Sequence, residues 1–202
     1  MGASSKGLVV NESQADARTR LLQASIEYFA GKGYHSTTTR EIAIAANMSS
    51  AALYVHYKSK ADVLFLICMT GLDELVGIMD EAADRSSGPL DEFRRVAYSF
   101  AIWHAEHSAM ARVANYQIHA LRPDHWTVVR GVRHSIEARV RGIIEAGMGD
   151  GVFHVRDSHM TTLSVISMGI DIARWYQADG SWTVDDVADH YRRMCLCMVG
   201  VV

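Results

Sequence analysis

Apolar residues recur every three or four positions along most of the chain, and no run alternates apolar with polar residues. This spacing places the apolar side chains on one face of a helix, whereas alternation would be typical of a strand. Only two prolines occur, so long helices are permitted. The sequence therefore predicts an all-α fold of about nine helices. Their expected ranges are 15–32, 39–46, 50–56, 60–84, 90–107, 109–121, 125–147, 158–178 and 183–200.

Capping residues mark the starts of the two short helices. Thr38 is placed to cap the first, and Glu41 follows three residues later, as in a capping box. Ile42 and Ala45 would then face inward. The segment Asn-Met-Ser is a turn, after which Ser49 is placed to cap the second helix. Two short helices joined by such a turn have the geometry of a helix-turn-helix motif.

The second short helix has the composition expected of a DNA-reading element. Residues 49–57 read SSAALYVHY, so small side chains come first and rings follow. In a helix-turn-helix the second helix lies in the major groove with its first residues at the base edges, and small residues allow a close approach. Ser49 and Ser50 would donate hydroxyls to phosphates. Tyr54 and His56 would lie on the outer side, with donors that reach phosphate.

The net charge of −3 is unevenly distributed along the chain. Residues 1–60 hold seven Lys/Arg and four Asp/Glu, whereas residues 61–202 hold thirteen and nineteen. A basic end on an acidic body suggests that the N-terminal part meets a polyanion, although ordinary surface scatter explains the charges about as well. Lys60 follows the capping residue Ser59 in the first turn of a long helix, where a cation opposes the helix dipole. That placement makes sense if a phosphate binds nearby.

The segment YFAGKGYHSTTTREIAIAANMSSAALYVHYKSKADVL resembles the DNA-binding domain of the TetR family of bacterial transcriptional repressors. The family pattern is an aromatic residue and Gly before Thr-Thr, then Arg-x-Ile-Ala, and then Leu-Tyr-x-His-aromatic-x-x-Lys. Two positions depart from it: Ala51 stands where Gly or Pro is common, and Asn47 stands where Gly is common, although Asn tolerates the left-handed conformation. The matching residues are Gly33, Thr37, Thr38, Arg40, Ile42, Ala43, Leu53, Tyr54, His56, Tyr57 and Lys60.

The resemblance implies a ligand-responsive repressor that binds a palindromic DNA operator as a homodimer and is released by a small-molecule effector. It implies an N-terminal three-helix DNA-binding domain over 13–60. From its own composition, the segment before it, over 1–12, is expected to be a disordered tail. A helical ligand-binding and dimerisation domain would follow over 61–202. The positions expected on the DNA-binding face are Thr38, Thr39, Arg40, Ser49, Ser50, Ala51, Tyr54, His56 and Lys60.

The resemblance also implies that the last two helices form the dimer. Apolar residues run at helical spacing through 158–178 and 183–200. When a helix at the end of a chain has such a wide apolar face, that face is usually buried against another surface, most often a partner subunit. The alternative is that these helices pack only within their own domain.

The effector-binding residues are predicted from side-chain type and from short matches. ARWYQADGSWTVDDVADHY, with ANYQ and GMGDGVF, resembles a branch of the family that senses acyl-CoA thioesters and controls fatty-acid or steroid breakdown. Arg174 lies in an apolar helix, where it either pairs with Asp171 or meets the carboxylate, phosphate or thioester end of a ligand. The candidate ligand-binding residues are Trp103, Tyr116, Arg130, Arg133, Met168, Asp171, Arg174 and Trp175.

Other function classes have less support. His104 and His107 are one helical turn apart and with His119 or His134 could hold a metal, but such pairs are common by chance, so we predict neither metal nor cofactor. No Gly-x-Ser-x-Gly, phosphate loop or His-Glu-x-x-His motif occurs, so we predict no enzyme. The alternative to a DNA-binding repressor is a helical small-molecule or metal-sensing protein with a non-DNA role.

The chain also carries signs of its compartment. Three cysteines are an odd number and show no Cys-x-x-Cys pairing, which favours a reducing environment over a disulfide scaffold. No apolar stretch approaches the roughly 20 residues of a membrane span. We therefore expect a cytoplasmic protein with no membrane partner.

Overall fold

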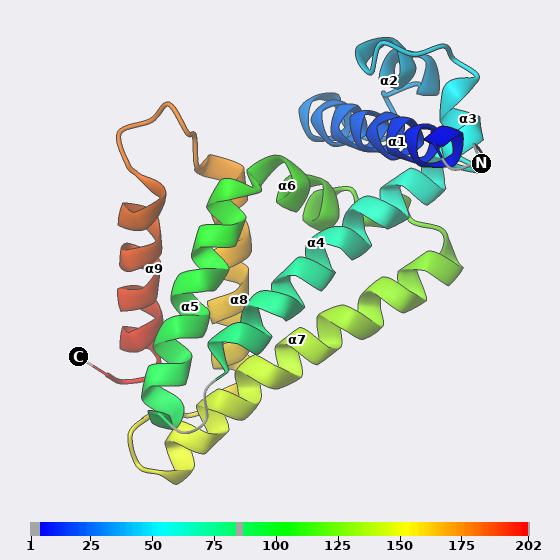
Figure 1. Cartoon of the computed structure of the whole chain (residues 1–202). Helices are drawn as coiled ribbons and strands as arrows, with labels where there is room; N and C mark the ends of the chain where they lie inside the picture. Colours follow the sequence, from blue (N-terminus) through cyan, green and yellow to red (C-terminus); the bar gives the residue numbers. More distant parts are fainter. Residues whose placement is uncertain (1–4, 84–86, 202) are drawn as a thin grey trace.

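The computed structural model describes residues 5–83 and 87–201, without the side chains of residues 5–14 and 52. Every regular element in these ranges is a helix, which confirms the all-α fold class (Figure 1). The helices are α1 (Ser5–Lys32), α2 (Thr39–Ala45), α3 (Ala52–His56), α4 (Lys60–Ala82), α5 (Gly88–Glu106), α6 (Ser108–Tyr116), the 3-10 helix η2 (Ile118–Ala120), α7 (Pro123–Gly149), α8 (Ser158–Trp175) and α9 (Val184–Met198).

Helices α1, α2 and α3 form a small unit at one end of the molecule, and α4 runs from it into a larger helical bundle (Figure 1). The unit closes over the fully buried side chains of Leu21, Phe29, Ile42 and Leu53. The Tyr57 hydroxyl donates to the carbonyl of Arg18 at 3.0 Å and so ties the end of α3 to α1. This small core holds the helix-turn-helix at one end of the long α4.

The start of the chain and the interior of α2 differ from the expectation. We expected residues 1–12 to form a disordered tail, but α1 already begins at Ser5, and residues 1–4 lie outside the described ranges. No proline interrupts this stretch, and each residue added to an existing helix gains one hydrogen bond at little cost. In α2, Ala45 is exposed, whereas Ala43 and Ala46 are buried.

The start of α3 also differs from the expectation. It begins at Ala52 rather than at residue 50, and Ser49 does not cap it. The residue at the capping position is Ala51, in the right-handed helical conformation, without a side-chain capping bond. A side chain caps a helix when its backbone is extended, so this local geometry leaves both serines uninvolved in capping.

The bundle contains α4 to α9, with α9 packed mainly on α5 and with α7 crossing α4, α5 and α8. The hydroxyl of Tyr191 on α9 donates to the carbonyl of Val165 on α8 at 2.8 Å. A Cβ at Gly169 would lie 2.5 Å from the ring of Phe100, so glycine permits the close approach of α8 to α5. None of the described helices has both the length and the apolar character needed to cross a membrane.

Candidate functional site

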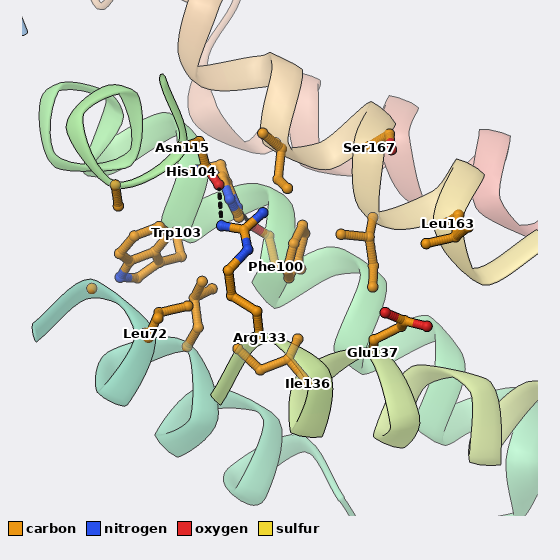
Figure 2. Close-up of a pocket in the computed structure, with 15 residues that line it drawn as sticks. Leu72, Phe100, Trp103, His104, Asn115, Arg133, Ile136, Glu137, Leu163 and Ser167 are labelled. Atoms are coloured by element: carbon orange, nitrogen blue, oxygen red, sulfur yellow. Dashed lines mark hydrogen bonds between the residues drawn. The ribbon is translucent and has the colours of Figure 1, made fainter. Parts of the chain in front are cut away.

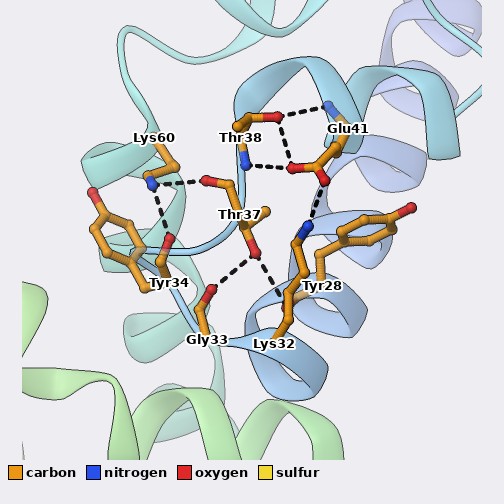
Figure 3. Close-up of polar contacts among 8 residues, drawn as sticks. All are labelled: Tyr28, Lys32, Gly33, Tyr34, Thr37, Thr38, Glu41 and Lys60. Carbon is orange, nitrogen blue, oxygen red and sulfur yellow. Dashed lines mark hydrogen bonds and ion pairs between the residues drawn. The ribbon is translucent and has the colours of Figure 1, made fainter.

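The start of α2 is fixed by a complete capping box (Figure 3). The Glu41 amide donates to the Thr38 hydroxyl at 3.2 Å, and the Thr38 amide donates to the Glu41 carboxylate at 2.8 Å. Lys32, from the end of α1, also donates to this carboxylate. The hydrogen bond from Lys32, followed by those from Thr38, lowers the pKa of Glu41 to about 2. The predicted capping box is confirmed, and it sets the orientation of α2 on α1.

Lys60 closes the turn between α1 and α2 from the other side (Figure 3). Its Nζ donates to the carbonyls of Tyr34 and Thr37, both at 2.8 Å, and lies 4.1 Å from the centre of the Tyr34 ring. Burial lowers the pKa of this ammonium group. Two carbonyl oxygens therefore compensate the positive charge of Lys60 at the N-terminal end of α4. From the sequence, a bound phosphate was expected to have this role. The contact of Lys60 with DNA stays a prediction.

The outer face of α3 presents the predicted DNA-contacting residues to solvent. Ser49, Ser50 and Ala51 are exposed at the turn that leads into the helix. Tyr54 is 58% exposed, and its hydroxyl lies 3.3 Å from that of Thr39 on α2. This contact links the two helices of the motif on their outer side.

The remaining predicted positions lie on the same small unit. Arg40 is exposed on α2, and His56 is half-buried at the end of α3. Asn47, in the turn, has φ 56°, the left-handed conformation that its type tolerates. Sequence reasoning missed the apolar side chains of Ile44 and Val55, which are 60% and 76% exposed. An exposed apolar side chain on this face can contact the methyl group of thymine.

A cavity of about 180 Å³, partly open to solvent, lies between α4, α5, α6, α7 and α8 (Figure 2). Its wall is mostly apolar, with a few polar side chains from α5, α6, α7 and α8. Such a wall is typical of small-molecule sites. The lining residues are Gly71, Leu72, Leu75, Phe100, Trp103, His104, Ala114, Asn115, Arg133, Ile136, Glu137, Leu163, Ile166, Ser167 and Ile170.

Arg133 and Asn115 bring polarity into this cavity (Figure 2). Nη1 of Arg133 donates to Oδ1 of Asn115 at 2.7 Å, and Nδ2 of Asn115 donates to the carbonyl of Ala111 at 2.9 Å. Burial lowers the pKa of the Arg133 guanidinium. No carboxylate of the described residues forms an ion pair with Arg133.

His104 is the most deeply buried polar residue of the cavity wall. Its Nδ1 lies 2.8 Å from the carbonyl of Phe100, and because a carbonyl only accepts, Nδ1 carries the proton. Burial lowers the pKa of His104 to about 4, so the ring is neutral near pH 7. Its Nε2 is buried and has no partner among the described residues.

Of the eight predicted ligand-binding residues, Trp103 and Arg133 line this cavity. Trp103 is buried, and its Nε1 donates to Glu74 at 2.9 Å. Sequence reasoning missed Asn115 altogether and considered His104 only as a metal ligand. The six predicted residues that do not line the cavity are Tyr116, Arg130, Met168, Asp171, Arg174 and Trp175.

The predicted residues on α8 lie outside the cavity lining because that helix turns a different face to the cavity, and their contact with a ligand stays a prediction. Arg174 is exposed and makes two hydrogen bonds to the Asp171 carboxylate, at 2.6 and 2.7 Å, as the simple ion-pair interpretation predicted. The Tyr116 hydroxyl donates to the same carboxylate at 3.3 Å. Trp175 packs edge-on against Trp182, with ring centres 6.5 Å apart.

The two histidines one turn apart on α5 make separate local contacts. Nδ1 of His107 lies 3.2 Å from the carbonyl of Trp103, whereas His104 bonds to Phe100. Within 5–83 and 87–201, no three His, Cys, Asp or Glu side chains are grouped as a metal ion would require.

One side-chain contact joins the cavity wall to the DNA-binding unit. Gln117 follows α6, two residues after Asn115, and its Oε1 accepts the Tyr34 amide at 3.0 Å. Lys60, at the start of α4, holds the carbonyl of the same Tyr34. Both helices that continue from these contacts, α4 and α6, line the cavity.

Comparisons with known proteins agree with this two-part architecture. Residues 21–67 match the model for bacterial regulatory proteins of the tetR family, and residues 86–199 match that for the tetracyclin repressor-like C-terminal domain. The HTH-type transcriptional repressor KstR2 of Rhodococcus jostii is 32% identical over 184 residues, which cover 89% of each chain.

Solved structures share the fold over almost the whole chain. A tetR-family regulatory protein from Rhodococcus RHA1 superposes with a TM-score of 0.87 at 35% identity, covering 92% of this chain and 98% of that one. AibR, solved in complex with isovaleryl coenzyme A and operator DNA, has a TM-score of 0.79 at 19% identity, covering 92% of this chain and 100% of its own.

Proposed function

The chain belongs to the TetR family of bacterial transcriptional regulators, and from this premise we propose that it is a dimeric repressor released from its operator by an acyl thioester. The family consists of transcriptional regulators rather than enzymes. The observation that carries the proposal is the outer face of α3, where small exposed residues precede Tyr54 while Leu53 anchors the helix from behind. A regulator of chromosomal DNA would work in the cytoplasm, as we expected.

Contacts with DNA divide into two kinds on this face. Hydroxyls of Ser49, Ser50 and Tyr54 donate to phosphates and fix the position of the protein on the duplex. Val55 and Ile44 offer apolar surface to base edges in the major groove. Thr39 and Arg40 add polar contacts from α2, whereas the Thr38 hydroxyl serves mainly to orient that helix. These features support α3 as the reading helix.

Dimerisation through α8 and α9 is supported by apolar side chains that the single chain leaves in solvent. Part of the apolar face of α9, including Val187, Tyr191 and Cys195, is buried inside the chain. A further set of apolar side chains on α8, on the segment after it and on α9 remains exposed, and a two-fold partner would cover it. Its members are Met160, Leu163, Trp175, Trp182 and Met194, each at least 40% exposed.

The size of the cavity supports an effector of which only part enters the protein. A volume of about 180 Å³ accommodates a small acyl group but not coenzyme A as well. The CoA portion would therefore lie outside the cavity. AibR, which shares this fold, was solved in complex with isovaleryl coenzyme A and operator DNA. The short segments that resemble acyl-CoA sensors agree with this assignment.

Release follows from the position of Tyr34 between two helices of the cavity wall. Gln117 holds its amide and Lys60 holds its carbonyl, so a shift of α6 or α4 reorients the turn before α2. An effector that fits one arrangement better than the other would change the separation of the two reading helices, which must be about 34–36 Å for successive major grooves.

The test starts with selection of sites from genomic DNA by the purified protein, followed by fluorescence anisotropy on the selected duplex. Tyr54→Phe removes only a hydroxyl and should weaken binding at least tenfold, the value of one hydrogen bond to a charged group. Tyr98→Phe is the matched control, because Tyr98 donates to Asp185 in the distant bundle. If both variants lose DNA affinity equally, or if neither loses affinity, the assignment of α3 as the reading helix is refuted.

The dimer surface is tested by light scattering after size-exclusion chromatography. Met194→Glu places a charge in the proposed interface and should yield monomers. Val128→Glu introduces the same charge on α7 at a residue that is 48% exposed, and should leave the dimer intact. A dimer that survives Met194→Glu would show that another surface joins the subunits.

A further inference from the structure

The cavity offers a hydrogen-bond acceptor and a set of hydrogen-bond donors close to one another, on His104 and Arg133. Both residues line it, and the Arg133 charge contributes to lowering the pKa of His104, which reflects their proximity (Figure 2). The chemistry of the two side chains therefore limits which group of an effector can occupy the space between them.

The acceptor is Nε2 of His104. The Phe100 carbonyl fixes the proton on Nδ1, so Nε2 carries a lone pair. This atom is buried and unpartnered within the described ranges, although buried polar atoms are nearly always hydrogen-bonded. A ligand group that donates a proton would complete its hydrogen bonding.

The donors belong to Arg133, whose guanidinium has five N–H groups in a fixed plane. Among the described contacts one of its nitrogens is used, on Asn115. The others are available to an oxygen that lies in the cavity. A ligand group that accepts a hydrogen bond would suit this side of the space.

The charges of the cavity wall indicate that this group is neutral. Arg133 and Glu137 carry opposite charges, and His104 is neutral. Glu137 also lies 3.1 Å from His159 and 3.5 Å from His134. A carboxylate between His104 and Arg133 would face the lone pair of Nε2, which repels it, whereas a neutral hydroxyl suits both residues.

We propose that the cavity recognises a hydroxyl group on the acyl portion of the effector. One oxygen atom then accepts from Arg133 and donates its proton to Nε2 of His104. A ketone satisfies Arg133 but turns a lone pair toward Nε2, and an unsubstituted chain satisfies neither residue. The inference rests on the proposed function only in assigning the hydroxyl to an acyl thioester.

Six-membered rings test the chemistry of the cavity without a thioester. A cavity of 150 Å³ is known to hold benzene, so about 180 Å³ should admit cyclohexanol and cyclohexanone. In ligand-observed NMR titrations of the dimer, cyclohexanol should bind about tenfold more tightly than cyclohexanone. Equal affinities, or a preference for the ketone, would overturn the inference.

Two asparagine variants locate the preference. His104→Asn keeps a donor for the Phe100 carbonyl, but its shorter side chain places the amide oxygen short of the position of Nε2, so the variant should bind both rings equally. His107→Asn is the matched control, because His107 makes the equivalent backbone contact but does not line the cavity. Should His104→Asn fail to fold, Arg133→Met replaces it, and both rings should then bind at least tenfold more weakly. A preference that survives in His104→Asn, or unchanged binding in Arg133→Met, contradicts the assignment.

Operator release separates this inference from the proposed function. 3-Hydroxybutyryl-CoA should release DNA at about one tenth of the concentration required of butyryl-CoA or acetoacetyl-CoA. If the rings are discriminated but no thioester releases DNA, the hydroxyl site stands and the thioester assignment fails. If all three thioesters release DNA equally and the rings bind equally, the repressor stands and the hydroxyl site is refuted.

Discussion

Replacing Lys60 by Met distinguishes two possible roles of its ammonium group: stabilising the turn before α2, or neutralising a DNA phosphate. The variant keeps the aliphatic stem and removes the ammonium group, which leaves the carbonyls of Tyr34 and Thr37 without their donor. Hydrogen bonds to a charged group contribute about 1.5–3 kcal/mol each, but water replaces part of this at a half-buried site. The cation over the Tyr34 ring adds about 0.5–1 kcal/mol. We expect the free energy of unfolding to fall by about 2 kcal/mol.

The assay combines urea unfolding, followed by circular dichroism, with operator binding at several salt concentrations. If Lys60 braces the turn, Lys60→Met destabilises the protein and weakens DNA binding, while the slope of log K against log salt stays unchanged. If Lys60 instead neutralises a phosphate, the variant makes one phosphate contact fewer, and the slope becomes less steep by about 0.9 per subunit. Lys58→Met is the matched control: Lys58 is exposed two residues earlier, so its loss should change the free energy of unfolding by less than about 0.5 kcal/mol. If Lys60→Met has a shallower salt dependence of DNA binding and an unchanged free energy of unfolding, Lys60 does not stabilise the turn.

Three further predictions concern folding. Thr38→Ala removes the capping hydroxyl of α2 and should lower the free energy of unfolding by about 1 kcal/mol, measured in urea. Gly147→Ala would place a Cβ 2.0 Å from the Phe153 ring and should cost about 1–3 kcal/mol, whereas Gly142→Ala, with open space on the same helix, should stabilise by about 0.5–1 kcal/mol. His104 has a folded pKa of about 4 against about 6.5 unfolded, so its stability contribution is complete above pH 6.5 and is lost as the pH falls toward 4. Between pH 6.5 and pH 4 the free energy of unfolding of the wild type should fall by about 3 kcal/mol more than that of His104→Asn. If the two proteins lose stability in parallel over this range, the low pKa of His104 is refuted.

The helix-turn-helix could be predicted from the sequence because its determinants are local. The capping box spans four residues, and the left-handed Asn47 depends on its own side chain. The start of α3 was predicted wrongly for an equally local reason. Ser49 and Ser50 are good capping residues by type, but the amide of Tyr54 bonds to the carbonyl of Ala51, so the chain is already turning before the helix begins.

Few of the predicted ligand-binding residues line the cavity, because residue type does not reveal which face of a helix is buried. Arg174 in an apolar run suggested a buried cation, yet its helix turns Asp171 and Arg174 toward solvent together, where they neutralise each other. Arg133 was selected only as a basic residue that could meet the ligand, and it does line the cavity. The difference arises from the packing of α7 and α8, which local spacing does not determine.

The link between cavity and DNA-binding unit lies beyond local sequence patterns altogether. Gln117 and Tyr34 are 83 positions apart, and Lys60 and Tyr34 are 26 apart. Each contact uses a side chain whose type fits many roles, so Lys60 was interpreted as a phosphate ligand and Gln117 was not singled out. Both contacts are made to the backbone of Tyr34. The side chain of Tyr34 does not determine them; they require only that its backbone lie close to Gln117 and to Lys60. Coupling between the two functions of this protein therefore depends on tertiary geometry, whereas each function separately depends on side-chain chemistry that the sequence displays.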